Sequence, residues 1–138
     1  MLVPCEVAVK SVVPAIRAYI AKELTQTYKM KQTDVAYVLG ITQTAVSKYL
    51  SNVRGQAIRI DQEMEIQSMM NEIASKIADR RVSGPRLVLE FCHVCEAVRG
   101  SGLMCALCQR SDPSLDIKKC LICKPMNPAG KNIKQSLP

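Results

Sequence analysis

An all-α fold is the first prediction from this sequence of 138 residues, and three patterns of apolar residues support it. From residue 15 to residue 24, apolar side chains recur on one face of a helix. Two short segments, 32–39 and 43–50, show the same spacing and are joined by Gly40-Ile41-Thr42. The longest pattern lies in residues 61–78, where apolar residues repeat at i, i+3, i+4, i+7 and i+8. Because apolar residues make up 48% of the chain, these helices can bury a core.

The two short segments predict a helix-turn-helix. Ala36 provides the small side chain that a close helix crossing needs. Gly40 is expected to end the first helix with a positive φ, and Thr42 is suited to cap the second helix. Ile41 and Val46 supply the apolar contacts that hold the two helices at an angle. Residues 1–60 are therefore predicted to form an N-terminal helix-turn-helix bundle.

The segment from Gln32 to Leu50 resembles the phage-repressor-like (XRE-type) helix-turn-helix family. Further matches make the chain look like a group of archaeal XRE-type transcriptional regulators, here with a C-terminal cysteine-rich extension. These matches are Pro4-Cys5-Glu6, Pro14-Ala15-Ile16-Arg17 and Val46-Ser47-Lys48-Tyr49-Leu50 with Arg54-Gly55. The resemblance covers residues 1–60. It implies a DNA-binding domain there and says little about the cysteines.

In that family the second helix of the motif lies in the major groove, with its N-terminal residues against base edges. Gln43 has the donor and the acceptor to bridge an adenine edge, and Thr44 could touch a thymine methyl group. Lys31, Arg54 and Arg59 would contact phosphates and fix the register. Position by position, the resemblance implies DNA contacts from Gln32, Thr42, Gln43, Thr44, Ser47, Lys48 and Arg54.

The alternative interpretation of residues 1–60 is a plain helical bundle whose polar residues form a solvated face. In either case the helical phase predicts Tyr37 and Tyr49 in the core. The charge balance favours a polyanionic partner, since residues 1–60 hold eight Lys and Arg against three Asp and Glu. Aromatic residues are only 4% of the chain, which disfavours an RNA or single-strand binder that stacks bases.

Residues 61–82 form a predicted amphipathic connecting helix. Asp61 is its expected N-cap, and Arg80 and Arg81 suit its C-terminal end. Its apolar face either packs on the helix-turn-helix of the same chain or pairs with a second chain. One short recognition helix reads few bases, whereas two related by symmetry read a palindrome. We therefore expect a homodimer on double-stranded DNA.

Six of the seven cysteines lie in residues 83–123, which we predict to be a small metal-binding module followed by a flexible basic tail at 124–138. They form three Cys-x2-Cys pairs, and two such pairs supply four thiolates to one metal site. The pairs closest in sequence, Cys92/Cys95 and Cys105/Cys108, are the first choice, and Cys120/Cys123 could replace one pair or serve elsewhere.

The sequence leaves open whether these cysteines bind zinc or an iron–sulfur cluster. Paired Cys-x2-Cys motifs usually bind zinc. However, no glycine follows these pairs, and a helix predicted over residues 87–98 would place Cys92 and Cys95 on a face with apolar neighbours, which suits an iron–sulfur cluster. His93 is expected at the surface. Cys5, which is far from the other cysteines in sequence, is expected to be structural and to pack near the first helix.

Most enzyme classes are excluded by the sequence. His93 is the single histidine, and neither a phosphate-binding loop nor a Gly-rich dinucleotide motif is present, so we expect no enzyme and no small-molecule substrate. No apolar run reaches the roughly 18 residues of a membrane span, and the first residues do not resemble a secretory signal. We therefore expect a cytoplasmic protein, where reduced cysteines favour metal binding over disulfides.

The predicted function is a sequence-specific DNA-binding transcription regulator. Its thiolate-bound metal would sense redox or metal state or would only stabilise the fold. The alternative is a basic, metal-stabilised adaptor of an RNA or transcription complex that reads no DNA sequence.

Overall fold

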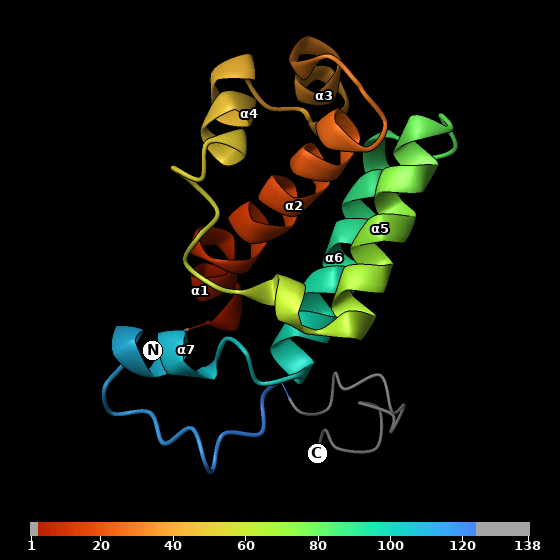
Figure 1. The fold of residues 1–138 in the computed structure, drawn as a ribbon. Coiled ribbons are helices and arrows are strands. Elements are labelled where there is room, and N and C mark those ends of the chain that lie inside the picture. The colour runs from red at the N-terminus through yellow and green to blue at the C-terminus, as the bar shows by residue number, and fades with distance from the viewer. Residues whose placement is uncertain (1–2, 124–138) are drawn as a thin grey trace.

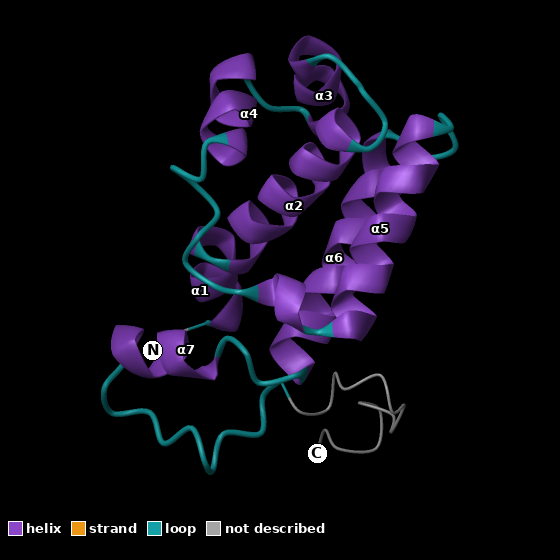
Figure 2. Ribbon diagram, viewed as in Figure 1, coloured by secondary structure: helices purple, strands orange, loops and turns teal. Residues whose placement is uncertain are grey.

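The computed structural model describes residues 3–123, and the tail predicted at 124–138 lies outside the described residues. Within residues 3–123 all regular elements are helical and no strand occurs (Figure 2). The all-α prediction is thus confirmed for this part of the chain. The elements in Figure 1 are α1 (Pro4–Lys10), α2 (Val12–Gln26), α3 (Gln32–Leu39), α4 (Gln43–Leu50), the 3-10 helix η1 (Ile60–Gln62), α5 (Met64–Ala78), α6 (Gly84–Gly100) and α7 (Cys105–Ser111).

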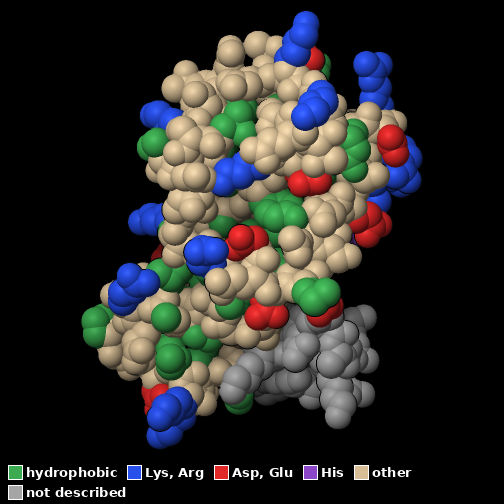
Figure 3. Space-filling model, viewed as in Figure 1, with side chains coloured by type: hydrophobic (Ala, Val, Ile, Leu, Met, Phe, Trp, Pro, Cys, Tyr) green, Lys and Arg blue, Asp and Glu red, His purple; other side chains and the backbone are tan. Residues whose placement is uncertain are grey.

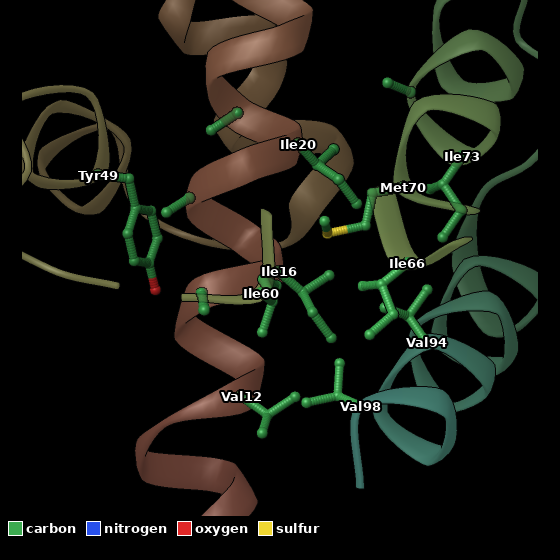
Figure 4. Packing of buried hydrophobic residues seen from close by; sticks show 14 of the residues in the cluster. Val12, Ile16, Ile20, Tyr49, Ile60, Ile66, Met70, Ile73, Val94 and Val98 are labelled. Carbon is green, nitrogen blue, oxygen red and sulfur yellow. The ribbon is translucent and has the colours of Figure 1, made fainter. Parts of the chain in front are cut away.

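Helix α2 runs through the centre of the fold, and α1, α3, α4, α5 and α6 all pack against it (Figure 1). Its sequence is aliphatic on several sides, so it can meet several partners. Figure 4 shows Ile16 and Ile20 of α2 facing the side chains of α5, with Tyr49 of α4 on another side. The residues of α2 that are buried are Val12, Ala15, Ile16, Ala18, Ile20, Ala21 and Leu24. The predicted face from Ala15 to Leu24 is confirmed, except that Tyr19 is half-buried.

Helices α5 and α6 lie side by side and cover α2 (Figure 1). The apolar face of α5 is buried inside the chain, through Ile66, Met70, Ile73, Ala74 and Ile77. Of the two predicted uses of this face, packing within the same chain is the one observed. A dimer cannot use this face without opening the fold.

An ion-pair cluster ties α5 to α6 at the edge of their contact. Lys76 Nζ lies 3.1 Å from Glu90 Oε1 of α6 and 3.4 Å from Glu72 Oε1 on its own helix. Helix α5 begins later than predicted. Asp61 lies in η1 and is not the N-cap of α5, because the chain makes a separate 3-10 turn that buries Ile60 before α5 starts at Met64.

Helix α1 was not predicted, and it links the two ends of the described chain. It begins at Pro4. Proline suits this position because the first N–H groups of a helix have no partner within the helix, so the N–H that proline lacks is not missed. Helix α1 packs against α2 and α7, and its buried residues are Val7 and Ala8. One continuous core therefore extends from Val7 to Cys108. The predicted boundary at 60/61 falls inside η1, and the one at 82/83 falls between α5 and α6. No helix of residues 3–123 is long and apolar enough to cross a membrane.

Candidate functional site

The turn between α3 and α4 is rigidly defined by backbone hydrogen bonds. Gly40 has φ 65° and ψ 33°, so it adopts the left-handed conformation expected from the sequence. The Ile41 N–H donates to the Ala36 carbonyl at 3.0 Å, and the Gly40 N–H donates to the Tyr37 carbonyl at 3.3 Å. This is the Schellman pattern of helix termination. Thr42 Oγ1 then accepts from the Ala45 N–H at 3.0 Å, which confirms Thr42 as the cap of α4.

Helix α4 presents one apolar face to α2 and one polar face to solvent. Ala45, Val46 and Tyr49 are buried, with Tyr49 only 4% exposed. Gln43, Thr44 and Ser47 are exposed, and Lys48 is half-buried. Thr42 is exposed too, but its hydroxyl oxygen is already used in the cap, so its first role is structural. The face therefore offers three free polar side chains from one well-anchored helix.

Gln32 and the basic residues flank this helix pair. Gln32 is the first residue of α3 and is exposed, and Lys31 precedes it. Arg54 is exposed in the loop after α4, where its N–H and the Val53 N–H both donate to the Lys48 carbonyl. Figure 3 shows Lys and Arg side chains projecting from the part of the surface that contains α3 and α4. Arg59, by contrast, contacts Asp61 at 3.5 Å, so its charge is partly offset.

Tyr37 differs from its prediction. It is 89% exposed on α3, whereas a core position was expected. Because α3 has only two turns and buries Val35 and Ala36, the following residue must point away from the core. Tyr37 thus adds an aromatic hydroxyl to the exposed surface of α3. The helical phase relative to Val35 and Ala36 was the sequence signal that could have revealed it.

The structure divides the cysteine pairs differently from the first choice made on sequence. Cys105 and Cys108 lie on α7, and Cys120 and Cys123 lie in the loop that follows it. All four line one cavity of about 190 Å³. Cys92 and Cys95, on α6, line a different hollow, an apolar groove of about 430 Å³. The expected combination of Cys92/Cys95 with Cys105/Cys108 is therefore not brought together around one space.

Cys5 lies beside the α6 pair. It lies on α1, where it is exposed and not packed, and it lines the same groove as Cys92 and Cys95 although it is far from them in sequence. Val88, Phe91, Cys92 and Cys95 do share one face of α6, as the predicted helix requires, but this face lines the groove. The core face of α6 is formed by Leu87, Val94 and Val98. His93 is exposed, in agreement with the prediction.

Arg99 lies between the two groups of thiols. It is only 8% exposed, and its Nε is buried without a hydrogen-bond partner. Its Nη1 donates to Cys5 Sγ at 3.8 Å, and it also lines the cavity of the other four cysteines. Within residues 3–123 no carboxylate forms a salt bridge with it. A buried guanidinium without an anionic partner is costly, so Arg99 is an unusual residue in this fold.

Burial and mutual proximity shift the ionisation of these groups. Burial raises the pKa of Cys95, although the nearby Arg99 charge opposes this shift. Burial also raises the pKa of Cys108, and the neighbouring Cys123 thiol adds to the effect. For Arg99, burial favours a lower pKa, but the Cys123 thiol and the other sulfurs outweigh it and the pKa is raised. The guanidinium therefore stays charged, near the Cys95 and Cys108 thiols, whose pKa values are raised.

In the described part of the chain, no three Cys, His, Asp or Glu side chains are already gathered as a metal site. The donor chemistry nevertheless fits a thiophilic metal, because four sulfurs and a buried, incompletely paired arginine surround one cavity. Cys120 and Cys123 lie in a segment without helix or strand.

Comparisons with protein-family models, with curated proteins and with solved structures find no match. Two features of the chain itself thus bear on its function. One is the exposed polar face of the capped helix α4, and the other is the cysteine-lined cavity beside α7.

Proposed function

We propose that this chain is a sequence-specific DNA-binding transcription regulator in which α3 and α4 form a helix-turn-helix. The observation that carries the proposal is the placement of Gln43, Thr44 and Ser47. These three side chains are exposed on one face of α4, while its opposite face is locked against α2. The major groove, about 12 Å wide, admits such a helix.

The flanking residues supply the sequence-independent part of the binding energy. Gln32 and Lys31 at the start of α3, with Arg54 after α4, are placed to contact phosphates on both sides of the inserted helix. Tyr37 adds an exposed hydroxyl for a further phosphate contact. Phosphate contacts release counterions, so the affinity should fall steeply as the salt concentration rises.

A homodimer remains part of the proposal because two recognition helices read a palindromic site. Since the apolar face of α5 is buried within the chain, the dimer contact must use another surface. The apolar groove that contains Cys92, with the exposed Val9 and Val88, is an available surface of this kind.

The thiol-bound metal is the second part of the proposal. Helix α6 carries Arg99 and packs directly on α2, and α2 in turn supports α4. A change of metal or redox state at the cysteines could therefore alter how α4 is held. If operator affinity is the same with metal-loaded and metal-stripped protein, the metal is structural only.

The DNA-binding proposal is tested by selecting a duplex from a random pool and measuring binding of variants. Gln43→Ala should weaken binding to the selected duplex about 10- to 100-fold and relax specificity at one base pair, since one bidentate base contact contributes about 1–3 kcal/mol. Lys31→Ala should instead weaken binding to all duplexes and lower the salt slope by about one.

A matched pair of serines serves as the control. Ser47→Ala should reduce affinity for the selected duplex, whereas Ser68→Ala, an exposed serine on α5, should not. Equal affinity for selected and scrambled duplexes, or tighter binding to single-stranded RNA, would contradict the proposal. The second of these results would favour the adaptor function.

A further inference from the structure

We infer that Cys105, Cys108, Cys120 and Cys123 form a single thiolate-bound metal centre and that Arg99 is its buried positive counter-charge. The inference deepens the metal part of the proposed function and does not depend on DNA binding. It departs from the ligand set that sequence proximity favours, because Cys92 and Cys95 are excluded.

The first step is the shared cavity. Two sulfurs come from α7, where Cys105 and Cys108 are one turn apart and so lie on the same side of the helix. The other two come from the loop that returns beneath α7. Asp112 and Asp116 fold this loop by accepting backbone hydrogen bonds from Ser114 at 3.2 Å and Lys118 at 3.0 Å. The loop thereby brings the last cysteine pair back to the cavity that the first pair lines.

The second and independent step is the state of Arg99. More than nine-tenths of this side chain is buried, it lines the same cavity, and its Nε has no partner. Buried charges are normally paired. Among residues 3–123, Arg99 forms no salt bridge, and its sulfur neighbours are the groups that could become anionic. An anionic centre in the cavity supplies the missing partner.

Metal binding produces that anion. Each of the four thiols releases its proton to solvent as its sulfur binds the metal. A divalent ion with four thiolates has a net charge of about −2, and an iron–sulfur cluster with four cysteine ligands is likewise held by thiolates. Arg99 offsets part of this charge and can donate N–H groups to sulfur. Both kinds of centre need the same four ligands and the same counter-charge.

The remaining cysteines differ in environment. Cys5 and Cys92 are exposed, and with Cys95 they line an open apolar groove on the other side of Arg99. Among residues 3–123, no buried side-chain nitrogen or oxygen without a hydrogen-bond partner belongs to a residue that lines that groove. Because Cys5 accepts a hydrogen bond from Arg99, Cys92 is the matched control within the same chain.

The test uses the full chain purified without oxygen, with metal content, absorbance and Co²⁺ titration as readouts. Cys120→Ser and Cys123→Ser should each lower the bound metal at least tenfold, whereas Cys92→Ser should leave it unchanged. Cys120 and Cys123 are preferred over the buried Cys108 because their loop positions tolerate substitution, and circular dichroism checks the fold of each variant. A colourless protein with zinc identifies a mononuclear centre, and a brown protein with iron and sulfide identifies a cluster.

Arg99 is tested as a positioning residue. Arg99→Gln should weaken metal affinity about 10- to 100-fold, as loss of a residue that supports metal ligands typically does. It should also raise the pH needed for half-loading, because thiolates form less readily without the positive charge. Arg99→Lys should restore part of the metal affinity and should bring the pH of half-loading part of the way back. In the metal-free state, Arg99→Met should resist urea at least as well as the parent, since it removes an uncompensated buried charge.

Three results would overturn the inference. One is retention of metal in the Cys120 and Cys123 variants, and another is loss of metal in the Cys92 variant. The third is absence of bound metal after titration with Zn²⁺ or Co²⁺ and after iron–sulfide reconstitution. All readouts are taken without DNA, so a failure of the DNA-binding proposal would leave them unchanged.

Discussion

Gly55 lies in the loop after α4, at a point where the backbone passes directly over α2. Its φ is +80°, a conformation that L side chains rarely adopt. A Cβ added there would lie 2.6 Å from Ala18 Cβ and 2.8 Å from the Pro14 carbonyl oxygen, both in α2. Substitution Gly55→Ala therefore combines backbone strain with a steric overlap that only movement of the loop or of α2 can relieve.

Two contributions make up the expected cost. The left-handed conformation costs a residue with a Cβ about 1–2 kcal/mol. Overlap in a packed region adds about 1–3 kcal/mol. We therefore expect Gly55→Ala to lower the free energy of unfolding by roughly 2–5 kcal/mol, which is a large share of the stability of a small domain.

Gly40→Ala is the matched control, because Gly40 has φ +65° but nothing within 4 Å of its added Cβ. Gly40→Ala should therefore lower the free energy of unfolding only by the cost of the left-handed conformation. Urea unfolding followed by far-UV circular dichroism measures both, and with a slope of about 2 kcal/mol/M the midpoint of Gly55→Ala should lie about 0.5–1.5 M below that of Gly40→Ala. If the two variants unfold at the same urea concentration, the close approach of the loop to α2 is refuted.

Three further predictions concern α3, α4 and α5. Thr42→Ala should lower stability by about 1 kcal/mol through loss of the hydrogen bond to Ala45 N–H, and Thr42→Ser should not, as chemical denaturation will show. Tyr49→Ala should cost about 3–5 kcal/mol because Tyr49 is buried, whereas the exposed Tyr37→Ala should stay within about 0.5 kcal/mol; equal effects would contradict their assigned positions. Met70 is fully buried, so Met70→Ala should lower the free energy of unfolding by about 2–5 kcal/mol, seen as a lower thermal midpoint that does not depend on protein concentration. A loss that varies with protein concentration would instead indicate that α5 forms a dimer contact.

The helix pair α3 and α4 could be predicted to the residue because its boundaries are encoded locally. Gly40 supplies the left-handed turn, and Thr42 supplies the cap two residues later. Both signals act within one or two turns of the helices that they delimit. The inward direction of Val46 and Tyr49 follows from the same local phase.

Helix α1 and the grouping of the cysteines could not be predicted, because both depend on contacts between distant residues. Cys5 and Arg99 are 94 residues apart in sequence, yet they touch. The seven-residue α1 is too short to be stable alone and forms where α2 and α7 support it. Likewise, Cys105 and Cys108 meet the last cysteine pair through the fold of a loop, which no spacing rule specifies.

The central position of α2 has a consequence for biosynthesis. Helix α2 leaves the ribosome before α5 and α6, whose core residues from Ile66 to Val98 follow Ile16 and Ile20 by 46 to 82 residues, a delay of roughly 2–16 seconds at about 5–20 residues per second. During that interval the nascent chain exposes apolar residues of α2 that are buried in the finished protein, which makes it a natural client for chaperones. A fragment that ends after α4 would stay in that state permanently, so the helix pair should be expressed only with the helices that enclose α2.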